Sequence, residues 1–414
     1  MQNSIYTEKS RIGGRELVTM MASIMALNAL AIDTMLPAFP NIAKSLSVTS
    51  ANLIQYIISI YLLGTAIGSL IFGPLSDRFG RKPVLLSSIL GYAICALLCG
   101  IATDYTFLLV MRFCNGLFGA ALGVLVTSII RDQFVGDAMA KRMSLVFLIF
   151  MVVPIIAPSI GQVVLLFSGW RTIFHFMVFM AIIVAFWAGR RLPETLDPAN
   201  VIPIAPRALT STWKKVASNR NATGYMLGAG LVQGALFGFL TSSQQIFDVV
   251  FGARDFFPIG FAIVALGIAS ANFANGRIVE RYGARRVSQA AVFLSIFFGT
   301  LQWMAGYFAP TSLPVFLALI TANMAMVGFI GANFSAIAMT PFGGMAGAAS
   351  SFQSFAKTIL ASAVGAIIGQ QFNGSVIPMA AGFTLCGISC LLLVLWSENG
   401  RLFTRPGTTQ HLPM

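Results

Sequence analysis

Charged residues are scarce in this chain. They make up 9% of its 414 residues, whereas a typical soluble domain carries about 25%. Apolar residues make up 57%, and a water-soluble fold of this composition would expose large apolar patches. The shortage of charge therefore excludes an ordinary soluble protein and indicates that most of the chain lies in lipid.

Residues that carry enzyme chemistry or bind metals are also few. The chain has two histidines, 13 acidic residues and five cysteines, and they show neither the clustering of an active site nor the spacing of metal ligands. His175 stands alone near the end of an apolar run and is interpreted as an interfacial residue. No phosphate-binding Gly-x-x-x-x-Gly-Lys-Ser/Thr loop occurs. We therefore expect neither an enzyme nor an ATPase, and no metal or organic cofactor.

The formal net charge of +13 comes from 26 Lys and Arg residues, most of which lie in short clusters between apolar runs. Nucleic-acid binding would instead place them along one basic face, so we expect no nucleic-acid partner. Clusters that alternate in this way follow the positive-inside rule. The positive-inside rule places the side of the membrane that carries the basic clusters in the cytoplasm. Lys9 and Arg11 near the start and Arg405 near the end belong to these clusters, so both termini are predicted to be cytoplasmic.

Apolar runs of about 20 residues are long enough to span a bilayer as helices. The chain has such runs near 16–39, 51–74, 83–102, 106–130, 143–166, 170–189, 222–245, 257–276, 287–308, 313–338, 346–371 and 376–396. They predict an all-α integral membrane fold with twelve transmembrane helices. The longest gap is rich in proline and basic residues. We therefore expect a six-helix bundle over 1–189, a cytoplasmic linker over 190–221, and a second six-helix bundle with a short cytoplasmic tail over 222–414.

A sequence repeat supports two related halves. Residues 73–82 read Gly-Pro-Leu-Ser-Asp-Arg-Phe-Gly-Arg-Lys, and residues 276–285 read Gly-Arg-Ile-Val-Glu-Arg-Tyr-Gly-Ala-Arg. Glycine, acid, arginine, aromatic residue and glycine match in register. Parallel repeats of six helices are typical of one large class of transporters.

The segment 73–82 resembles the loop signature of the major facilitator superfamily, Gly-x-x-x-Asp-Arg-x-Gly-Arg-Arg/Lys. Residues 33–40 (Asp-Thr-Met-Leu-Pro-Ala-Phe-Pro), Arg112-Phe113-x-x-Gly116-x-x-Gly119 and residues 154–161 (Pro-Ile-Ile-Ala-Pro-Ser-Ile-Gly) resemble motifs of its twelve-helix drug:proton antiporters. Trp170-Arg171 and Leu192-Pro193-Glu194-Thr195 are similar to the bicyclomycin/chloramphenicol-resistance (Bcr/CflA-like) branch. The resemblance implies two pseudo-symmetric bundles in a bacterial cytoplasmic (inner) membrane.

Two charged residues inside the predicted spans are candidates for proton coupling. Asp33 and Arg112 lie at similar predicted depths in the runs 16–39 and 106–130, which both line the central cavity in the resembled fold. A charged carboxyl is costly inside a membrane, so Asp33 is expected to bind a proton in one conformation and release it in another. A guanidinium beside it would stabilise the charged form. The alternatives are a structural ion pair or a helix-end residue near the lipid headgroups for Asp33, and a clamp on backbone carbonyls for Arg112.

A third charge, Lys357, lies near the middle of the run 346–371, too deep for its ammonium to reach water easily. It departs from the general pattern of the resembled family. The same is true of Ala157-Pro158-Ser159-Ile160-Gly161-Gln162, where the family usually has Gly-Pro-x-x-Gly-Gly. Lys357 can bind an anionic group of the substrate, neutralise Asp33, or itself titrate; the alternative is a lysine in a wet cavity.

Two further groups of residues suggest moving parts. By resemblance, the repeat motif is expected to gate the halves through Gly73, Asp77, Arg78, Gly80, Arg81, Glu280 and Arg281. The two loop glycines Gly73 and Gly80 suit tight turns, although the arginines alone could serve only membrane topology. Pro154, Pro158 and Gly161 could form a hinge, or the prolines could simply be tolerated in the membrane.

Polar and aromatic residues within the spans are candidates for the substrate cavity. They are Asn28, Gln55, Tyr56, Asn115, Gln233, Phe237, Thr241, Asn323 and Asn333, together with Lys357. With 35 Phe and 19 Met in the chain, an apolar and adaptable pocket is expected.

The leading hypothesis is a monomeric, proton-coupled exporter of small, largely apolar drugs or metabolites, with the proton as coupling ion. A second hypothesis is a transporter, for import or export, of an anionic or zwitterionic metabolite that uses Lys357. An integral-membrane enzyme or sensor is a remote third, because clustered catalytic residues and a soluble sensor domain are both missing from the sequence.

Overall fold

The computed structural model describes residues 12–50, 52–134, 136–198, 201 and 206–403. The basic residues Lys9, Arg11 and Arg405, on which the predicted orientation partly rests, lie outside these ranges. The described residues form helices and no strands. Twelve of the helical segments are long and apolar enough to cross a membrane, which confirms the all-α, twelve-helix fold.

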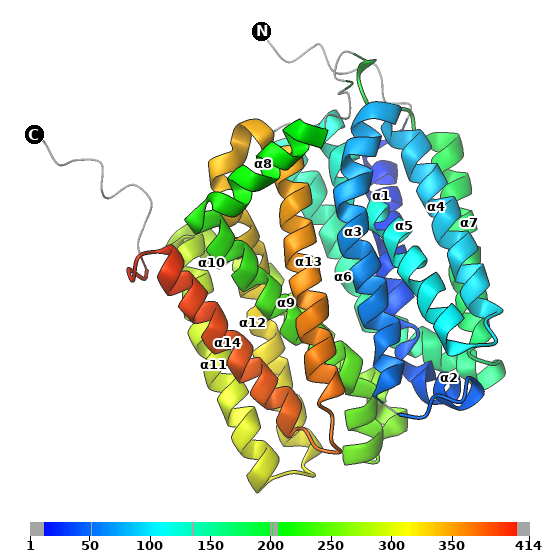
Figure 1. The fold of residues 1–414 in the computed structure, drawn as a ribbon, viewed down its shortest axis with the longest axis vertical. Coiled ribbons are helices and arrows are strands. Elements are labelled where there is room, and N and C mark those ends of the chain that lie inside the picture. The colour runs from blue at the N-terminus through cyan, green and yellow to red at the C-terminus, as the bar shows by residue number, and fades with distance from the viewer. Residues whose placement is uncertain (1–11, 51, 135, 199–200, 202–205, 404–414) are drawn as a thin grey trace, which may run out of the picture. The chain divides into compact units, whose positions relative to one another are not determined.

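The chain divides into two compact units (Figure 1). The first comprises Met1–Ser47 and Ile60–Ala205, and the second comprises Val48–Ser59 and Pro206–Met414. The first contains α1 (Gly14–Asp33), η1 (Leu36–Ala38), α2 (Phe39–Ser45), most of α3 (Tyr56–Phe79), α4 (Arg81–Gly100), α5 (Tyr105–Gln133), α6 (Gly136–Phe167) and α7 (Arg171–Arg191).

The second unit begins with a short segment that precedes and starts α3, and then runs from α8 to the end of the chain. Its elements are η2 (Leu53–Gln55), α8 (Pro206–Ser218), α9 (Arg220–Gln245), η4 (Ile246–Val250), η5 (Arg254–Phe256), α10 (Phe257–Tyr282), α11 (Ala284–Phe308), α12 (Leu313–Met339), η6 (Thr340–Met345), α13 (Ala346–Gln370) and α14 (Ile377–Ser397). The stretch predicted as a linker, 190–221, thus contains the helix α8, whose Trp213 ring stacks on Phe352 of α13 at 6.3 Å between centroids.

The first predicted helix, 16–39, is interrupted in the structure. The α-helix ends at Asp33, a 3₁₀ turn follows, and α2 continues to Ser45. Pro37 and Pro40 explain the break, because proline lacks an amide hydrogen and clashes with the preceding helical turn. The Thr34 hydroxyl donates to the Leu30 carbonyl at 2.5 Å and so satisfies one acceptor at the helix end. As a result, Asp33 lies at the end of an α-helix and not within one.

The tight turn between α3 and α4 consists of one residue, Gly80. Its φ of +98° lies in the region that favours glycine. The matching Gly283 separates α10 from α11 with a φ of +85°. Gly73 was expected to form part of this turn, and that expectation is wrong: α3 continues through Gly73 and Pro74 to Phe79.

Close helix contacts in both units depend on glycine. On α5, a Cβ at Gly116 would overlap the backbone carbonyl of Tyr61 in α3. On α9, a Cβ at Gly234 would lie 2.6 Å from Val364 Cβ of α13, and one at Gly238 would lie 2.8 Å from Ile368 Cγ2. Small residues spaced by four let membrane helices approach closely, and Figure 1 shows α9 and α13 side by side.

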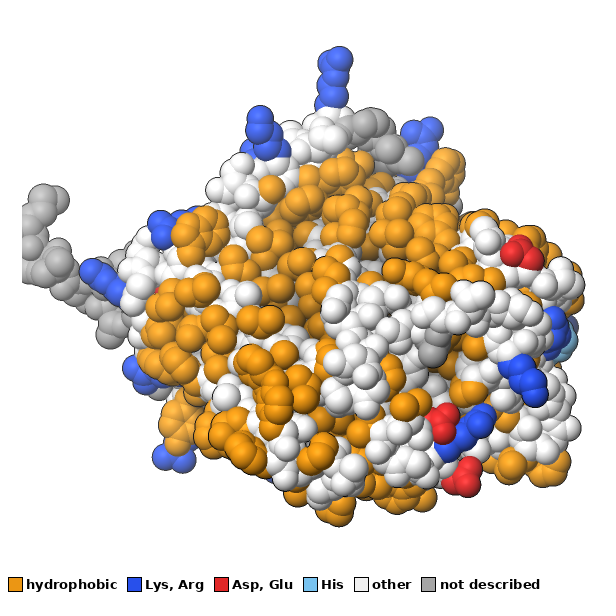
Figure 2. Space-filling model, turned by 60° about the horizontal axis from the view of Figure 1, so that its bottom comes forward, with side chains coloured by type: hydrophobic (Ala, Val, Ile, Leu, Met, Phe, Trp, Pro, Cys, Tyr) orange, Lys and Arg blue, Asp and Glu red, His pale blue; other side chains and the backbone are white. Residues whose placement is uncertain are grey.

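The surface and the helix ends are consistent with a membrane environment. Phe167 and Phe308 are 86% and 83% exposed, and Figure 2 shows hydrophobic side chains over much of the visible surface. Outside the spans, Asp104 caps α5 and accepts hydrogen bonds from the Phe107 and Thr106 amides. These bonds lower the pKa of its carboxyl.

The α3–α5 contact predicts a difference between two glycines of the same helix. Gly116→Ala should destabilise the protein by about 1–3 kcal/mol, the usual cost of overpacking, because the obstructing atoms belong to the Tyr61 backbone. Gly123→Ala is the control, since a Cβ there meets nothing within 4 Å. Thermal unfolding of the detergent-purified variants measures the difference, and equal midpoints would contradict this account of the contact.

Candidate functional site

The first unit contains a polar network around Arg112 of α5. The Arg112 side chain is fully buried. Its Nη2 donates to the Ala31 carbonyl of α1 at 3.0 Å, and its Nη1 donates to Asn115 Oδ1 at 3.1 Å. The guanidinium carbon lies 4.4 Å from the centroid of the Tyr61 ring of α3, close enough for a cation–π interaction. A charge buried inside a membrane protein requires such partners.

The network continues from Asn115 to α4. Asn115 Nδ2 donates to the Tyr92 carbonyl at 2.9 Å, and the Tyr92 hydroxyl donates to the Leu27 carbonyl of α1 at 2.9 Å. Both side chains are fully buried. Three helices, α1, α4 and α5, are thus connected by two side chains that bond to backbone carbonyls.

Asn28 connects the network to α3. The Tyr61 hydroxyl donates to Asn28 Oδ1 at 2.6 Å, and Asn28 Nδ2 donates to the Gly119 carbonyl of α5 at 2.9 Å. A Cβ at Gly119 would lie 2.7 Å from both Asn28 Oδ1 and the Tyr61 hydroxyl. The glycine therefore leaves space for this pair of hydrogen bonds. Asn28, Arg112 and Asn115 were predicted, whereas Tyr61 and Tyr92 were not.

Asp33 lies next to this network without joining it. Its side chain is 5% exposed, and it forms no ion pair or hydrogen bond with any residue that the structure describes. Arg112 binds the Ala31 carbonyl, two residues earlier in the chain, and not the Asp33 carboxyl. The structure thus contains no ion pair between Asp33 and Arg112.

The motif at 154–161 packs against the same point of α1. Gly161 of α6 faces the helix break: a Cβ there would overlap the Thr34 carbonyl, one residue after Asp33. α6 is one helix from Gly136 to Phe167 and includes Pro154 and Pro158. The structure therefore shows close packing of α6 on the Asp33–Thr34 segment and no interruption of α6 at the candidate hinge.

A second charged cluster, at the α3–α4 turn, contains the repeat motif. Arg81 is 3% exposed and bonds to the Asp77 carboxylate, to Asp132 at 2.8 Å and to the Ser76 hydroxyl at 2.7 Å. Glu194 accepts hydrogen bonds from the Arg81 and Lys82 amides at 2.9 and 3.1 Å, so its carboxylate caps the start of α4. Asp132 was missed; it follows Arg131 at the end of a predicted span.

Arg78 of the same motif is exposed and lies over the Phe79 ring at 5.4 Å. In the second unit, Glu280 and Arg281 are both exposed, and Arg281 lies over the Tyr282 ring at 5.4 Å. In this second copy of the motif, the ion pair is formed by Arg285, whose Nε lies 2.7 Å from the Glu398 carboxylate. Glu398 is not among the predicted residues, because it lies just after the last span, far from the repeat.

Lys357 belongs to α13 in the second unit and is half-buried. Its backbone carbonyl lies 3.2 Å from the position of a Cβ at Gly230, where α13 packs on α9. Among the residues that the structure describes, the ammonium has no ion-pair or hydrogen-bond partner. A half-buried lysine without an acidic partner is available to bind an anion from outside the chain.

The remaining cavity candidates of the second unit are mostly engaged in helix packing. Gln55 Nε2 donates to Gln245 Oε1 at 2.6 Å, and the Thr241 hydroxyl donates to the Gly238 carbonyl at 3.1 Å. Asn323 donates to the Ser295 carbonyl at 3.2 Å and Asn333 to Asn275 Oδ1 at 2.8 Å. Phe237 is buried against Gly365, whereas Tyr56 and Gln233 are half-buried.

Comparison with known proteins identifies the family. The family model described as Major Facilitator Superfamily matches residues 21–366. The chain belongs to the major facilitator superfamily. It is 32% identical over 382 residues to the uncharacterised MFS-type transporter YdgK of Bacillus subtilis (strain 168), covering 91% of this chain and 92% of the relative. It is 27% identical over 381 residues to the bicyclomycin resistance protein homolog of Haemophilus influenzae, covering 90% and 94%.

A solved structure of a D-xylose–proton symporter has the same fold, with a TM-score of 0.72 at 14% identity over 93% of this chain and 97% of that one. The protein is therefore a multi-pass membrane transporter of the major facilitator superfamily, not an enzyme, and it moves a small molecule. The predicted resemblance to the drug-resistance branch is confirmed by the family match and by the bicyclomycin resistance protein homolog.

The Arg112 network predicts that lysine cannot replace this arginine. Arg112→Lys keeps the charge but loses the planar fork that reaches Ala31 and Asn115 together. Because one hydrogen bond to a charged group is worth about 1.5–3 kcal/mol, transport should fall at least about tenfold. Arg190→Lys is the control, since Arg190 is exposed and lies over the Phe186 ring at 4.2 Å. Equal transport by the two variants in proteoliposomes would refute a structural need for the guanidinium.

Proposed function

We propose that the protein is a proton-coupled antiporter that exports small, largely apolar drugs or metabolites by alternating access. It acts as a monomer in a bacterial cytoplasmic membrane, with both termini inside. The observation that carries the proposal is a buried carboxyl without a cation: Asp33 is 5% exposed and has no ion-pair partner among the described residues. A carboxyl in such a place is a functional site by default.

A proton is the simplest compensation for Asp33. The charged carboxylate is costly in a low-dielectric interior, and Asp33 also lies at the C-terminal end of α1, where the helix dipole disfavours negative charge. Protonation removes both costs. A conformation that brings water or a cation to the carboxyl favours release of the proton, so the two protonation states favour different conformations.

Arg112 provides a fixed positive charge that affects the protonation of Asp33. The Arg112 guanidinium donates to the carbonyl of Ala31, which lies two residues before Asp33 in α1. A shift of α1 along α5 breaks that bond and changes the distance between the guanidinium and the carboxyl. Proton binding and helix movement are thereby coupled in this proposal.

The charged cluster at the α3–α4 turn supports a gating role for the repeat motif. Arg81 connects Asp77 of α3 to Asp132 of α5, and Glu194, which follows α7, binds the start of α4. A cluster that joins the ends of four helices stabilises one arrangement of them. In the proposed cycle, these bonds break and re-form as the transporter changes conformation.

The cargo class is supported by the relatives and by composition. One relative is named for bicyclomycin resistance, and the chain contains 35 Phe and 19 Met, side chains that form adaptable apolar pockets. An exporter of this kind expels uncharged or weakly charged compounds in exchange for protons.

Asp33→Asn tests the coupling. In liposomes with an internal pH dye, the wild type should show a substrate-dependent proton flux, and Asp33→Asn should show none, because an amide cannot release a proton. Asp104→Asn is a matched control: Asp104 is exposed and caps α5, and asparagine caps equally well. Proton flux of wild-type size in Asp33→Asn would refute the proposal, and Lys357 would become the candidate coupling residue.

A second candidate function rests on Lys357, the half-buried lysine without an acidic partner. An ammonium with no acidic partner among the described residues favours a carboxylate or another anionic group on the cargo. In this case the protein imports or exports an anionic or zwitterionic metabolite, coupled to protons as above.

Counterflow with anionic and cationic probes separates the two cargo classes. If the cargo is anionic, Lys357→Ala should slow counterflow of anionic probes by about tenfold or more, the value of one charge-assisted hydrogen bond, and leave cationic probes unchanged. Lys215→Ala, which removes an exposed lysine of α8, controls for net charge. An equal effect of both variants, or no effect of either, would exclude Lys357 as the anion-binding group.

A further inference from the structure

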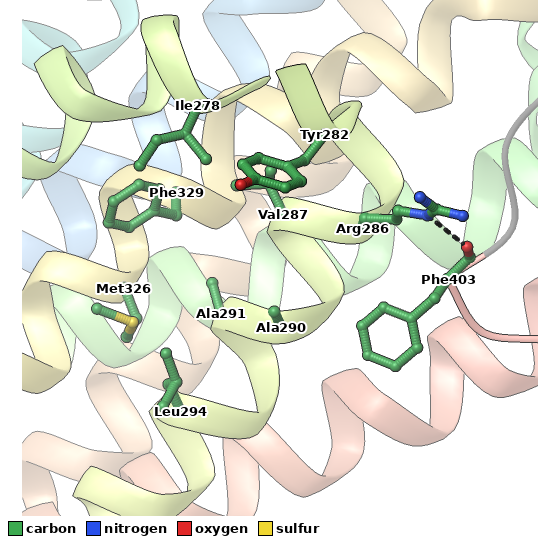
Figure 3. Close-up of a pocket in the computed structure, with 10 residues that line it drawn as sticks. All are labelled: Ile278, Tyr282, Arg286, Val287, Ala290, Ala291, Leu294, Met326, Phe329 and Phe403. Atoms are coloured by element: carbon green, nitrogen blue, oxygen red, sulfur yellow. Dashed lines mark hydrogen bonds between the residues drawn. The ribbon is translucent and has the colours of Figure 1, made fainter. Parts of the chain in front are cut away.

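The second unit contains a cavity of about 390 Å³ at its arginine-rich end, where α10 ends and α11 begins. This volume is within the range of ligand pockets, about 300–1,000 Å³. The lining residues come from α10, α11, α12 and the segment after α14 (Figure 3). They are Ile278, Tyr282, Arg286, Val287, Ala290, Ala291, Leu294, Met326, Phe329 and Phe403.

The cavity opens on the outer face of the helices. Ile278, Tyr282 and Leu294 are 37%, 47% and 45% exposed, so the cavity is open to the surroundings of the helices. Apart from Arg286 and the Tyr282 hydroxyl, the lining side chains are apolar. A transported substrate needs convergent polar groups that fix its orientation, and this cavity lacks them. Its chemistry fits a hydrocarbon chain.

Phe403 forms one wall of the cavity in a constrained conformation. Its φ of +59° is costly for a residue with a side chain. Its amide donates to Gln289 Oε1 at 2.6 Å, its carbonyl accepts from Arg286 Nε at 2.9 Å, and its ring stacks on Phe293 at 6.2 Å. These three contacts hold the segment after α14 beside the cavity.

Arg286 places a positive charge at the edge of this apolar cavity. The side chain is exposed, and only its Nε is used, for the bond to Phe403. Within the described part of the chain it has no ion-pair partner. The neighbouring Arg285 is occupied by Glu398. Arg286 therefore keeps its terminal N–H groups available for an anion, and guanidinium binds phosphate well.

We propose that this cavity binds an anionic phospholipid, with one acyl chain in the cavity and the phosphate on Arg286. Charge complementarity favours this occupant, because Arg286 has no acidic partner among the described residues and a lipid phosphate supplies one. Basic pockets between transmembrane helices are known to bind anionic headgroups. The bound lipid would contact α10, α11 and α12 together. This inference does not depend on the transported substrate or on proton coupling.

Lipid retention by the full-length, detergent-purified protein tests the proposal. Native mass spectrometry with dioleoyl phosphatidylglycerol and dioleoyl phosphatidylcholine compares two lipids that differ only in the headgroup. The wild type should bind phosphatidylglycerol at least about tenfold more tightly, as expected for a charge-assisted hydrogen bond.

Two variants separate the headgroup site from the chain site. Arg286→Gln should remove the preference for phosphatidylglycerol. Ala290→Phe, which fills the cavity from an exposed position of α11 and leaves Arg286 in place, should weaken binding of both lipids. Lys215→Gln removes one exposed charge outside the cavity and should behave like the wild type. Elution profiles confirm that each variant remains folded.

Three results would overturn the proposal. The first is equal affinity of the wild type for the two lipids. The second is an unchanged preference in Arg286→Gln. The third is binding that appears only after residues 404–414 are deleted, which would make the chain's own C-terminal segment the occupant.

Discussion

The burial of the Arg112 charge is the constraint on which the first unit depends. A guanidinium inside a membrane protein persists only where its donors and its charge are compensated. Here the partners are the Ala31 carbonyl, the Asn115 amide and the Tyr61 ring, which come from three helices. They can meet only if the helices cross closely, and Gly116 allows this. Close packing and charge compensation therefore depend on each other.

Asp33 presents the opposite case. Asp33 is buried like the residues around it, but no hydrogen-bond donor or cation among the described residues stabilises its carboxylate. The helix break caused by Pro37 places it at a helix end, and Gly161 of α6 packs against the adjacent backbone. Movement of α6 or α5 against α1 therefore acts on the surroundings of this carboxyl. The proposed proton coupling rests on this arrangement, in which a fixed charge with polar partners lies next to an acid that has none.

The sequence predicts most of the fold because the signals are local. Apolar length identifies the twelve helices, and the position of Gly80 predicts the α3–α4 turn. The same reasoning fails where tertiary contacts decide. The motif predicts Gly73 in the turn, but the helix continues through it. The apolar run predicts Asp33 within a helix, but the helix ends there because of Pro37. Tyr61, Tyr92 and Glu398 were missed because their partners are far away in the sequence. One sequence does not show which face a tyrosine presents, nor that Arg285 pairs with an acid after the last helix.

The proposed antiporter releases the Asp33 proton when it binds its substrate, because the two protonation states favour different conformations. Proton release by the detergent-purified protein in weakly buffered solution measures this without any membrane gradient. Addition of a transported compound should release protons from the wild type and from Asp104→Asn, and release none from Asp33→Asn. Equal release from Asp33→Asn would contradict the account and place the coupling proton elsewhere in the chain.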